Sequence, residues 1–331
     1  MKEFIEVVDD FSLFFNKLKV ECDDIDRSFQ SIDYRISFVK EKEKQGIYRS
    51  ISNYFDRIWD LVKDCESYDP YYLSCRDHLH NEIHRFICAG GLNNMVFDKP
   101  LGHAGDYLTI YHYFLEYSGE HTYEILINQY SRSIPAAIAH RNRIPLLEKE
   151  IKHHSRNGAN IMSIGCGPAI EIQRTSTEPY FHDCNFTLFD ADQRALDFVI
   201  DNLPAGISNV STINSSLLGL LKFLKKKKGN GGDQDLIYCC GLFDYVGDRL
   251  AGRLLQGLYA NLKPGGRLIV TNVSSDIDDR GYFEFFAGWE LILRTREDME
   301  KMASNLPAEV KYQVNPDAET GANIYLFLEK Q

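Results

Sequence analysis

The chain has 331 residues, of which 44% are hydrophobic and 12% aromatic, and a formal net charge of −11 at pH 7. This length and apolar content are enough to bury one large core or two smaller ones. The negative charge argues against nucleic acid as the main partner, because binding phosphates needs a basic surface. No apolar run approaches the roughly 20 residues of a membrane-spanning helix, so we expect no integral membrane association.

The N-terminal residues, MKEFIE, are acidic and amphipathic, which is not the pattern of a secretory signal. The eight cysteines show no paired C-x-x-C spacing, so the sequence signals neither a zinc ribbon nor a disulfide framework. Vicinal Cys239 and Cys240 fall in a predicted buried strand, and we interpret them as small core residues rather than a redox pair. These features predict a protein of a reducing compartment, the cytoplasm.

The first 155 residues have helical periodicity throughout. Apolar residues recur at three- and four-residue spacing from Phe4 to Leu18 and again from Ile47 to Leu61, which indicates two amphipathic helices. Further helices are predicted over 71–87, 106–117, 121–131 and 135–154.

From residue 160 the pattern changes to short apolar runs that alternate with helical segments. This is the signature of an α/β domain with a parallel sheet and crossover helices. The turn-prone segment 155–159 predicts a boundary between a helical domain, 1–155, and an α/β domain, 156–331. Thr295, followed by Arg296-Glu297-Asp298, predicts a helix N-cap. Strands are predicted near 160–164, 185–189, 209–213, 235–240 and 266–271, with a final pair near 309–314 and 323–329.

The stretch 161–169, IMSIGCGPA, is a short buried strand followed by a glycine turn, and Asp190 closes the next apolar run 25 residues after Gly165. Glycines let the backbone approach a nucleotide-like ligand, and a downstream acid can accept both ribose hydroxyls. A dinucleotide fingerprint would place a third glycine at Ile170, which weakens the case for NAD.

Two later stretches favour a different cofactor. Residues 235–246, DLIYCCGLFDYV, are a strand that runs into a loop, and residues 262–272, LKPGGRLIVTN, are a helix end, a Pro-Gly-Gly turn and a strand. Together with the glycine turn and Asp190, they resemble the class I S-adenosylmethionine-dependent methyltransferases over residues 158–331. The resemblance implies a Rossmann-like sheet of seven strands with a C-terminal antiparallel hairpin.

The N-terminal half shows a narrower resemblance. Residues 99–107, KPLGHAGDY, and 140–143, HRNR, are similar to segments of a bacterial methyltransferase group that includes the 3-hydroxypalmitate methyl ester synthase, which makes a quorum signal. The departures are His103, where that group commonly has tyrosine, and His140, where it commonly has valine.

The resemblance implies S-adenosyl-L-methionine as cofactor and S-adenosyl-L-homocysteine as product, bound at the carboxyl ends of the strands. Gly165 and Gly167 should approach the methionine and ribose, Asp190 should hold the ribose, and residues 214–216 should face the adenine. The predicted cofactor-binding residues are Ser163, Gly165, Gly167, Asp190, Ala191, Ser215, Ser216, Cys240, Gly241, Asp106 and Tyr107. Asp192 is equally well read as a helix N-cap or a ligand contact.

The predicted catalytic residues are Asp244, Tyr245, Arg141 and His103. Asp244 could act as a base, orient the cofactor or cap a helix. Arg141 and Arg143 project from different faces of one helix, so at most one is expected in the site, where it would present a carboxylate; a salt link between domains is the alternative. His103 could serve as the base for a hydroxyl acceptor.

For the other notable residues, we favour structural roles over functional ones. The insertion between Asn272 and Thr295 is rich in aromatic rings, which we expect mainly to pack against the helical half, with one or two lining a pocket. These rings are Tyr282, Phe283, Phe285, Phe286 and Trp289. Asn272 should point to the same sheet edge as the cofactor. Lys225–Lys228 are interpreted as a solvated helix end. His80 and His84 have chelating spacing, but no third ligand stands at a motif position, so no metal is predicted.

We therefore expect an enzyme that methylates a small molecule, with the carboxylate of a 3-hydroxy fatty acid as the candidate acceptor. The first alternative keeps the fold and methylates a hydroxyl or amine of another metabolite. The second is a cofactor-binding regulatory protein without turnover, and the third is an NAD oxidoreductase. The oligomeric state stays open, with a homodimer among the options.

Overall fold

The computed structural model describes residues 1–29, 31–156, 158–228, 232–307 and 310–331, and the chain packs as two units. The first unit comprises Met1–Ile138 and Asp278–Glu290, and the second comprises Ala139–Ile277 and Leu291–Gln331. The domain boundary predicted over 155–159 stays a proposal, and Asn157 within it lies outside the described residues.

The first unit is helical, as its periodicity predicts. Apolar residues at three- and four-residue spacing place one buried stripe on each long helix. Helix α1 buries Phe4, Val8 and Phe11 on that stripe, and all three are 0% exposed. The helices are α1 (Lys2–Ser28), α2 (Ile32–Lys44), α3 (Ile47–Asp60), α4 (Pro70–Ile87), α5 (Gly91–Asp98), α6 (Tyr107–His112), α7 (Thr122–Ser133) and the first turn of α8 (Pro135–His154).

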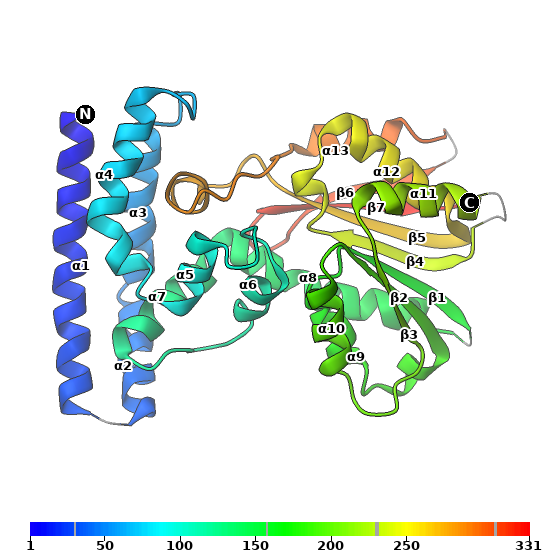
Figure 1. Ribbon diagram of the computed structural model, residues 1–331, viewed down its shortest axis with the longest axis horizontal. Helices are drawn as coiled ribbons and strands as arrows, with labels where there is room; N and C mark the ends of the chain where they lie inside the picture. Colours follow the sequence, from blue (N-terminus) through cyan, green and yellow to red (C-terminus); the bar gives the residue numbers. More distant parts are fainter. Residues whose placement is uncertain (30, 157, 229–231, 308–309) are drawn as a thin grey trace. The chain divides into compact units, whose positions relative to one another are not determined.

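Aromatic rings form much of the core between α1, α3 and α4, which run side by side (Figure 1). Phe11 of α1 stacks on Tyr54 of α3 with ring centroids 4.5 Å apart, and Phe15 stacks on Phe86 of α4 at 5.4 Å. Such ring pairs stabilise a core beyond the area they bury.

The segment 278–290 lies in the sequence between two elements of the second unit but packs in the first. Its π-helical part, η3 (Gly281–Phe286), buries Tyr282 between the rings of Phe55 and Tyr130. Phe285 packs on Phe4 and Tyr72. The predicted packing of these insertion rings against the helical half is therefore confirmed.

One predicted helix is shorter than expected. The pattern over 106–117 predicts one helix, but α6 ends at His112, and the backbone then tightens into i→i−3 hydrogen bonds. Tyr117 adopts a left-handed φ of 49°, and its amide donates to Gln129 Oε1 at 3.0 Å. This tertiary hydrogen bond replaces a helical one.

In the second unit, the described residues form one seven-stranded sheet in the order β3-β2-β1-β4-β5-β7-β6, parallel except for β7. This is the predicted Rossmann-like sheet of the class I methyltransferase fold, with its C-terminal antiparallel hairpin. The strands are β1 (Ala159–Ile164), β2 (Cys184–Asp190), β3 (Val210–Asn214), β4 (Gln234–Cys240), β5 (Leu262–Val273), β6 (Lys311–Pro316) and β7 (Asn323–Glu329).

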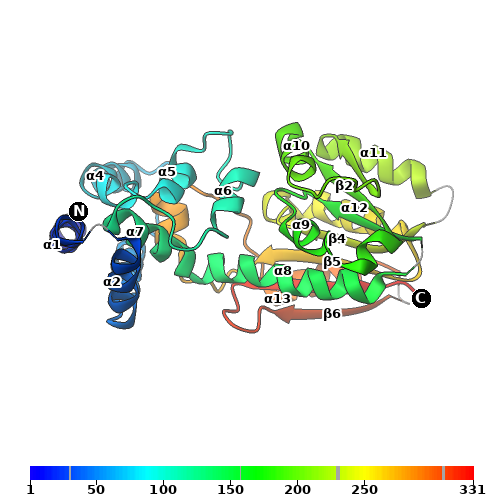
Figure 2. The same cartoon turned by 90° about the horizontal axis from the view of Figure 1, so that it is seen from below.

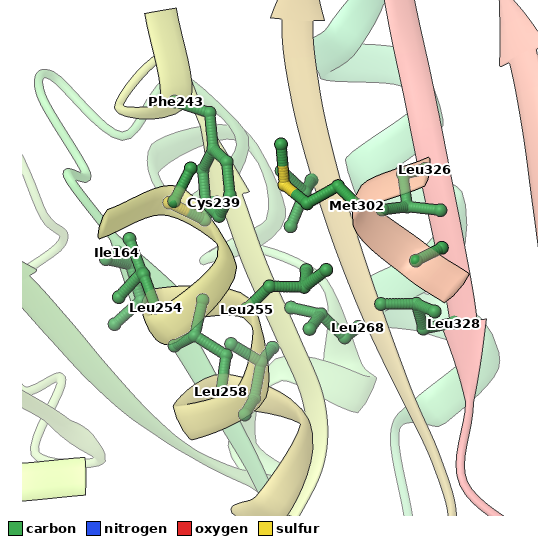
Figure 3. Close-up of a cluster of buried hydrophobic side chains, with 14 of the residues drawn as sticks. Ile164, Cys239, Phe243, Leu254, Leu255, Leu258, Leu268, Met302, Leu326 and Leu328 are labelled. Carbon is green, nitrogen blue, oxygen red and sulfur yellow. The ribbon is translucent and has the colours of Figure 1, made fainter. Parts of the chain in front are cut away.

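Helices cover both faces of this sheet (Figure 1). On one face, α12 packs Leu254, Leu255 and Leu258 onto β4, β5 and β7, and Cys239 lies in this core as a small apolar residue (Figure 3). On the other face, Leu147 and Ile151 place the later part of α8 along the strands (Figure 2). The remaining elements are α9 (Ile170–Thr175), η1 (Pro179–Asp183), α10 (Gln193–Asp201), α11 (Leu217–Lys228), η2 (Phe243–Tyr245), α12 (Asp248–Ala260) and α13 (Arg296–Ser304).

The Pro-Gly-Gly turn lies inside a longer strand than predicted. β5 begins at Leu262, which pairs with Gln234, and the register then shifts so that Arg267 pairs with Leu236. The sequence puts the strand start at 266 because proline and glycine usually end strands; here they form a bulge.

The remaining local predictions fall at helix ends and strand starts. Thr295 caps α13 with the predicted N-cap, completed as a capping box by Asp298. The lysine run 225–228 ends α11. Residues 229–231 after it, and residues 308–309 at the predicted start of β6, lie outside the described residues. Within the described ranges, no helix has the length and apolarity that crossing a bilayer requires.

We predict that Gly281→Ala destabilises the first unit by about 1–3 kcal/mol, because a Cβ there would stand 2.2 Å from the carbonyl oxygen of Phe55. Gly91→Ala is the matched control, since among the residues that the structure describes its Cβ would meet only Glu124 Oε1, at 3.7 Å. It should change stability by less than about 0.5 kcal/mol. Urea unfolding of both variants measures the difference. Equal stabilities would contradict the close packing of η3 on α3.

Candidate functional site

The glycine turn, residues 165–169, leaves β1 in a left-handed backbone conformation. Gly165 and Gly167 have φ of +62° and +52°, which residues with a Cβ rarely adopt. The amides of Gly165 and Cys166 both donate to the carbonyl of Phe189, at 2.8 and 3.2 Å. The turn is therefore tied to the end of β2 before it enters α9.

The Asp190 carboxylate joins the two strand ends. One oxygen accepts the amide of Gly167 at 2.9 Å, and the other accepts the amide of Asp192 at 2.9 Å. Each oxygen keeps a further lone pair for a ligand hydroxyl. Asp192 itself caps α10 by accepting from the Arg194 amide at 2.9 Å, so its capping role is present.

The end of β3 joins the same region. The Ser215 amide donates to the Asp190 carbonyl at 3.0 Å, and Asn214 Nδ2 donates to the Ala191 carbonyl at 3.0 Å. Ser216 accepts the Gly219 amide at 3.3 Å, in the first turn of α11. The structure thus brings together Gly165, Gly167, Asp190, Ala191, Ser215 and Ser216, all predicted to bind the cofactor.

The strand order of the sheet reverses between β1 and β4: the crossovers after β1 add β2 and then β3 on one side, and the chain then returns to add β4 on the other side of β1. The carboxyl ends of strands at such a switch point form the crevice where open α/β sheets bind ligands. Cys240 ends β4 beside this point, and Gly241 follows it with φ of +117°.

Asp244 follows in η2 and has a structural task. It is 3% exposed, and its Oδ1 accepts the Val273 amide at 2.6 Å, which fixes the end of β5. Burial raises the pKa of Asp244, opposed by Arg143 and the Val273 amide. Its catalytic role stays a prediction, as does that of Tyr245, which is 46% exposed.

Asn272 turns out to brace the loop after β5. It is fully buried, and its Nδ2 donates to the carbonyl of Ile292 at 2.8 Å. The Arg294 guanidinium donates to Asn272 Oδ1.

Of the two arginines in α8, Arg143 lies at this edge of the sheet. It is 5% exposed, its Nη2 donates to Asn323 Oδ1 at 2.9 Å, and its Nη1 stands 3.4 Å from where a Gly241 Cβ would be. Burial and the guanidinium groups of Arg143 and Arg141 hold the pKa of His140 well below its usual range. The prediction names Arg141 as catalytic, whereas the described contacts with the β4 and β7 ends belong to Arg143.

His103, Asp106 and Tyr107 belong to the first unit. Asp106 caps α6 by accepting the Thr109 amide at 2.8 Å, and it is fully buried. His103 is exposed and Tyr107 half-buried. Their predicted roles at the cofactor and acceptor stay predictions.

The sequence patterns do not predict a buried polar pair, Tyr238 and Glu171, that lies close to the glycine turn. The Tyr238 hydroxyl donates to Glu171 Oε1 at 2.9 Å, and Ser163 lies opposite Tyr238 in the strand register. Burial raises the pKa of Glu171 to about 7. The sequence signal for this pair is an acidic residue, Glu171, between the apolar Ile170 and Ile172 directly after the turn.

The described residues contain no group of three or more His, Cys, Asp or Glu that could hold a metal ion. His80 contacts the Phe286 carbonyl through Nε2 at 2.8 Å, and burial lowers its pKa, so the neutral ring donates this hydrogen bond.

No family model and no curated protein matches the chain. Solved structures do. A possible exported protein from Bordetella parapertussis is 17% identical, with a TM-score of 0.55 over 75% of this chain and 92% of that one. At this identity, the likeness concerns the fold alone.

Two solved methyltransferases also match, with lower TM-scores. The magnesium protoporphyrin IX methyltransferase from Synechocystis PCC 6803, with bound S-adenosylhomocysteine, is 11% identical, covering 60% of this chain and 86% of that chain, with a TM-score of 0.45. The N-methyltransferase NodS from Bradyrhizobium japonicum WM9, in complex with S-adenosyl-L-homocysteine, is 15% identical, with 58% and 87% covered and a TM-score of 0.40.

We predict that Glu171→Gln removes a pH dependence of stability. Between the ordinary pKa of 4.5 and about 7, folded Glu171 holds a proton that the unfolded chain has lost. The free energy of unfolding of the wild type therefore falls as pH rises through this window, by up to about 1.4 kcal/mol per unit. Urea unfolding at pH 5 and 7.5 should show a smaller fall for Glu171→Gln. Identical falls in both proteins would show that Glu171 is not buried as described.

Proposed function

We propose that this protein is an S-adenosylmethionine-dependent methyltransferase that acts on a small molecule. The observation that carries the proposal is the Asp190 carboxylate, which ties the glycine turn of β1 to the end of β2 at the switch point of a Rossmann-like sheet. The antiparallel β7 beside β5 supports the same class of enzyme.

The residues of this edge suit the cofactor. Apart from the two chain neighbours, no heavy atom of the described residues lies within 4 Å of where a Cβ of Gly167 would stand, so a ligand can approach that backbone closely. Asp190 would accept the ribose hydroxyls, and Ser215 and Ser216 would face the adenine. Cys240 and Gly241 would line the methionyl end. Asp106 and Tyr107 of the first unit are proposed as further cofactor contacts.

When bound, S-adenosylmethionine would supply a sulfonium methyl group: the acceptor atom would bond to the methyl carbon as the carbon–sulfur bond breaks, and the electron pair of that bond would stay on sulfur in the leaving S-adenosylhomocysteine. The protein's part is to hold the acceptor in line and to keep water away. A carboxylate acceptor needs no base, whereas a hydroxyl or amine must usually lose a proton.

The narrower proposal is that the acceptor is the carboxylate of a 3-hydroxy fatty acid, as in the group that makes the 3-hydroxypalmitate methyl ester. The segments KPLGHAGDY and HRNR support it. One of the two arginines of α8, Arg141 or Arg143, would present the carboxylate. Asp244, Tyr245 or His103 would act only on an acceptor that must lose a proton. Methylation of a hydroxyl or amine is the competing candidate, and an essential base near neutral pH in the rate profile would favour it. The cytoplasm stays the proposed location.

Calorimetric titration with S-adenosylmethionine and S-adenosylhomocysteine tests the proposal. We expect micromolar binding by the wild type and a loss of at least tenfold in Asp190→Ala, since a charge-assisted hydrogen bond contributes about 1.5–3 kcal/mol. Asp201→Ala, which removes an exposed carboxylate at the end of α10, should bind like the wild type. Absence of binding by the wild type would refute the proposal and direct attention to nicotinamide cofactors.

A further inference from the structure

The guanidinium of Arg143 is buried and forms no ion pair with a carboxylate of the described residues. No carboxylate of the described residues lies within 4 Å of it, and its Nε has no hydrogen-bond partner there. Asp244 is close enough for the charge of Arg143 to lower its pKa, but Asp244 Oδ1 accepts the Val273 amide. A buried charge without a partner is costly, so sequences seldom keep one unless a ligand pairs with it.

Three more polar side chains on neighbouring strands have atoms without partners among the described residues. They are Asn323 Nδ2, the Tyr325 hydroxyl and Thr271 Oγ1, in residues that are at most 3% exposed. Asn323 and Tyr325 are two residues apart on β7, so they point to the same face. Thr271 pairs with Tyr325 in the register and therefore shares that face. We call these three residues and Arg143 the Arg143 cluster.

Hydrogen bonds from Asn142 fix the position of this cluster. Asn142 Nδ2 donates to Asp317 Oδ1 at 3.2 Å and to Glu319 Oε2 at 2.9 Å, in the turn between β6 and β7. Asp317 also accepts the Thr320 amide at 2.9 Å. The helix that carries Arg143 is thus attached to the turn that leads into Asn323, which preorganises the four side chains.

We propose that the Arg143 cluster is a carboxylate-binding site, a proposal that rests on the proposed function. The unused groups are hydrogen-bond donors or hydroxyls that can donate, and a planar carboxylate offers two acceptors that match a guanidinium fork. Arg143 is the only charged member of the cluster, and the lowered pKa of His140 keeps that neighbouring ring neutral. That charge suits a monoanion rather than a phosphate dianion.

Two molecules could supply this carboxylate: the methionyl part of the cofactor or the acceptor. The three strand residues of the cluster lie on β5 and β7, on the far side of β4 from Asp190 at the end of β2. This order of strands favours the acceptor. In either case Arg143, rather than Arg141, is the arginine that presents the carboxylate.

The test compares Arg143→Gln with the wild type by calorimetry. The cofactor probes are S-adenosylhomocysteine and 5′-methylthioadenosine, which lacks the amino-acid carboxylate. The acceptor probes, titrated into the complex with S-adenosylhomocysteine, are 3-hydroxydecanoate and its methyl ester. Lys149→Gln removes an exposed charge from the same helix and is the matched control, expected to bind every probe like the wild type.

Loss of at least tenfold in affinity for S-adenosylhomocysteine, with 5′-methylthioadenosine unchanged, would support the site with the cofactor as the source. An equal loss for 3-hydroxydecanoate, with both nucleosides unchanged and no comparable loss for the ester, would support it with the acceptor as the source. Binding of S-adenosylhomocysteine and 3-hydroxydecanoate within twofold of the wild type, or no carboxylate-dependent binding of either, would overturn it.

Tyr325→Phe gives a second readout that does not depend on replacing a buried charge. Because the hydroxyl has no partner in the described residues, its removal should not lower stability, but it should weaken binding of the same carboxylate. Unchanged affinity would count against the site. If the wild type bound neither nucleoside, the proposed function would fail and the inference with it; nucleoside binding with Arg143→Gln unaffected would refute the inference alone.

Discussion

The pair of hydrogen bonds to the Asp190 carboxylate is the interaction on which the proposed site depends. Through Gly167 and Asp192, one side chain sets the backbone after β1 and the backbone after β2. The Asp190 carbonyl accepts from Ser215 and so draws in the end of β3. Three strand ends therefore take their positions from one residue, and the left-handed glycines allow the turn to meet it.

Buried polar groups on the α8 side of the sheet divide into two kinds. The pair of Tyr238 and Glu171 is joined by its own hydrogen bond beneath the glycine turn, so it contributes to structure. The Arg143 cluster, on β5, β7 and α8, keeps donors without acceptors. A buried group that lacks a partner destabilises the free protein, and we attribute its presence to ligand binding. The same face thus holds a satisfied structural pair and a site prepared for an anion.

Much of this fold could be predicted from the sequence, because seven short apolar runs separated by helical segments allow few arrangements. The glycine turn and Asp190 could also be singled out, since their spacing has a physical purpose. For segment 278–290, the sequence predicts that its rings pack against the helical half. It does not predict where they pack, because an aromatic side chain can fit many places in a hydrophobic core. To decide which of Arg141 and Arg143 lies at the site, one must know which face of α8 packs on the sheet. The Arg143 cluster depends on strand register between residues far apart in sequence, which local patterns do not contain.

A crystal structure of the protein grown with S-adenosylhomocysteine tests the central claim most directly. We expect the ribose hydroxyls to lie within hydrogen-bond distance of the Asp190 carboxylate, with the nucleoside against the backbone of Gly165 and Gly167. We also expect the amides of Gly167 and Asp192 to keep their hydrogen bonds to Asp190. A nucleoside bound away from this edge of the sheet, or an Asp190 carboxylate turned away from the ribose, would contradict it.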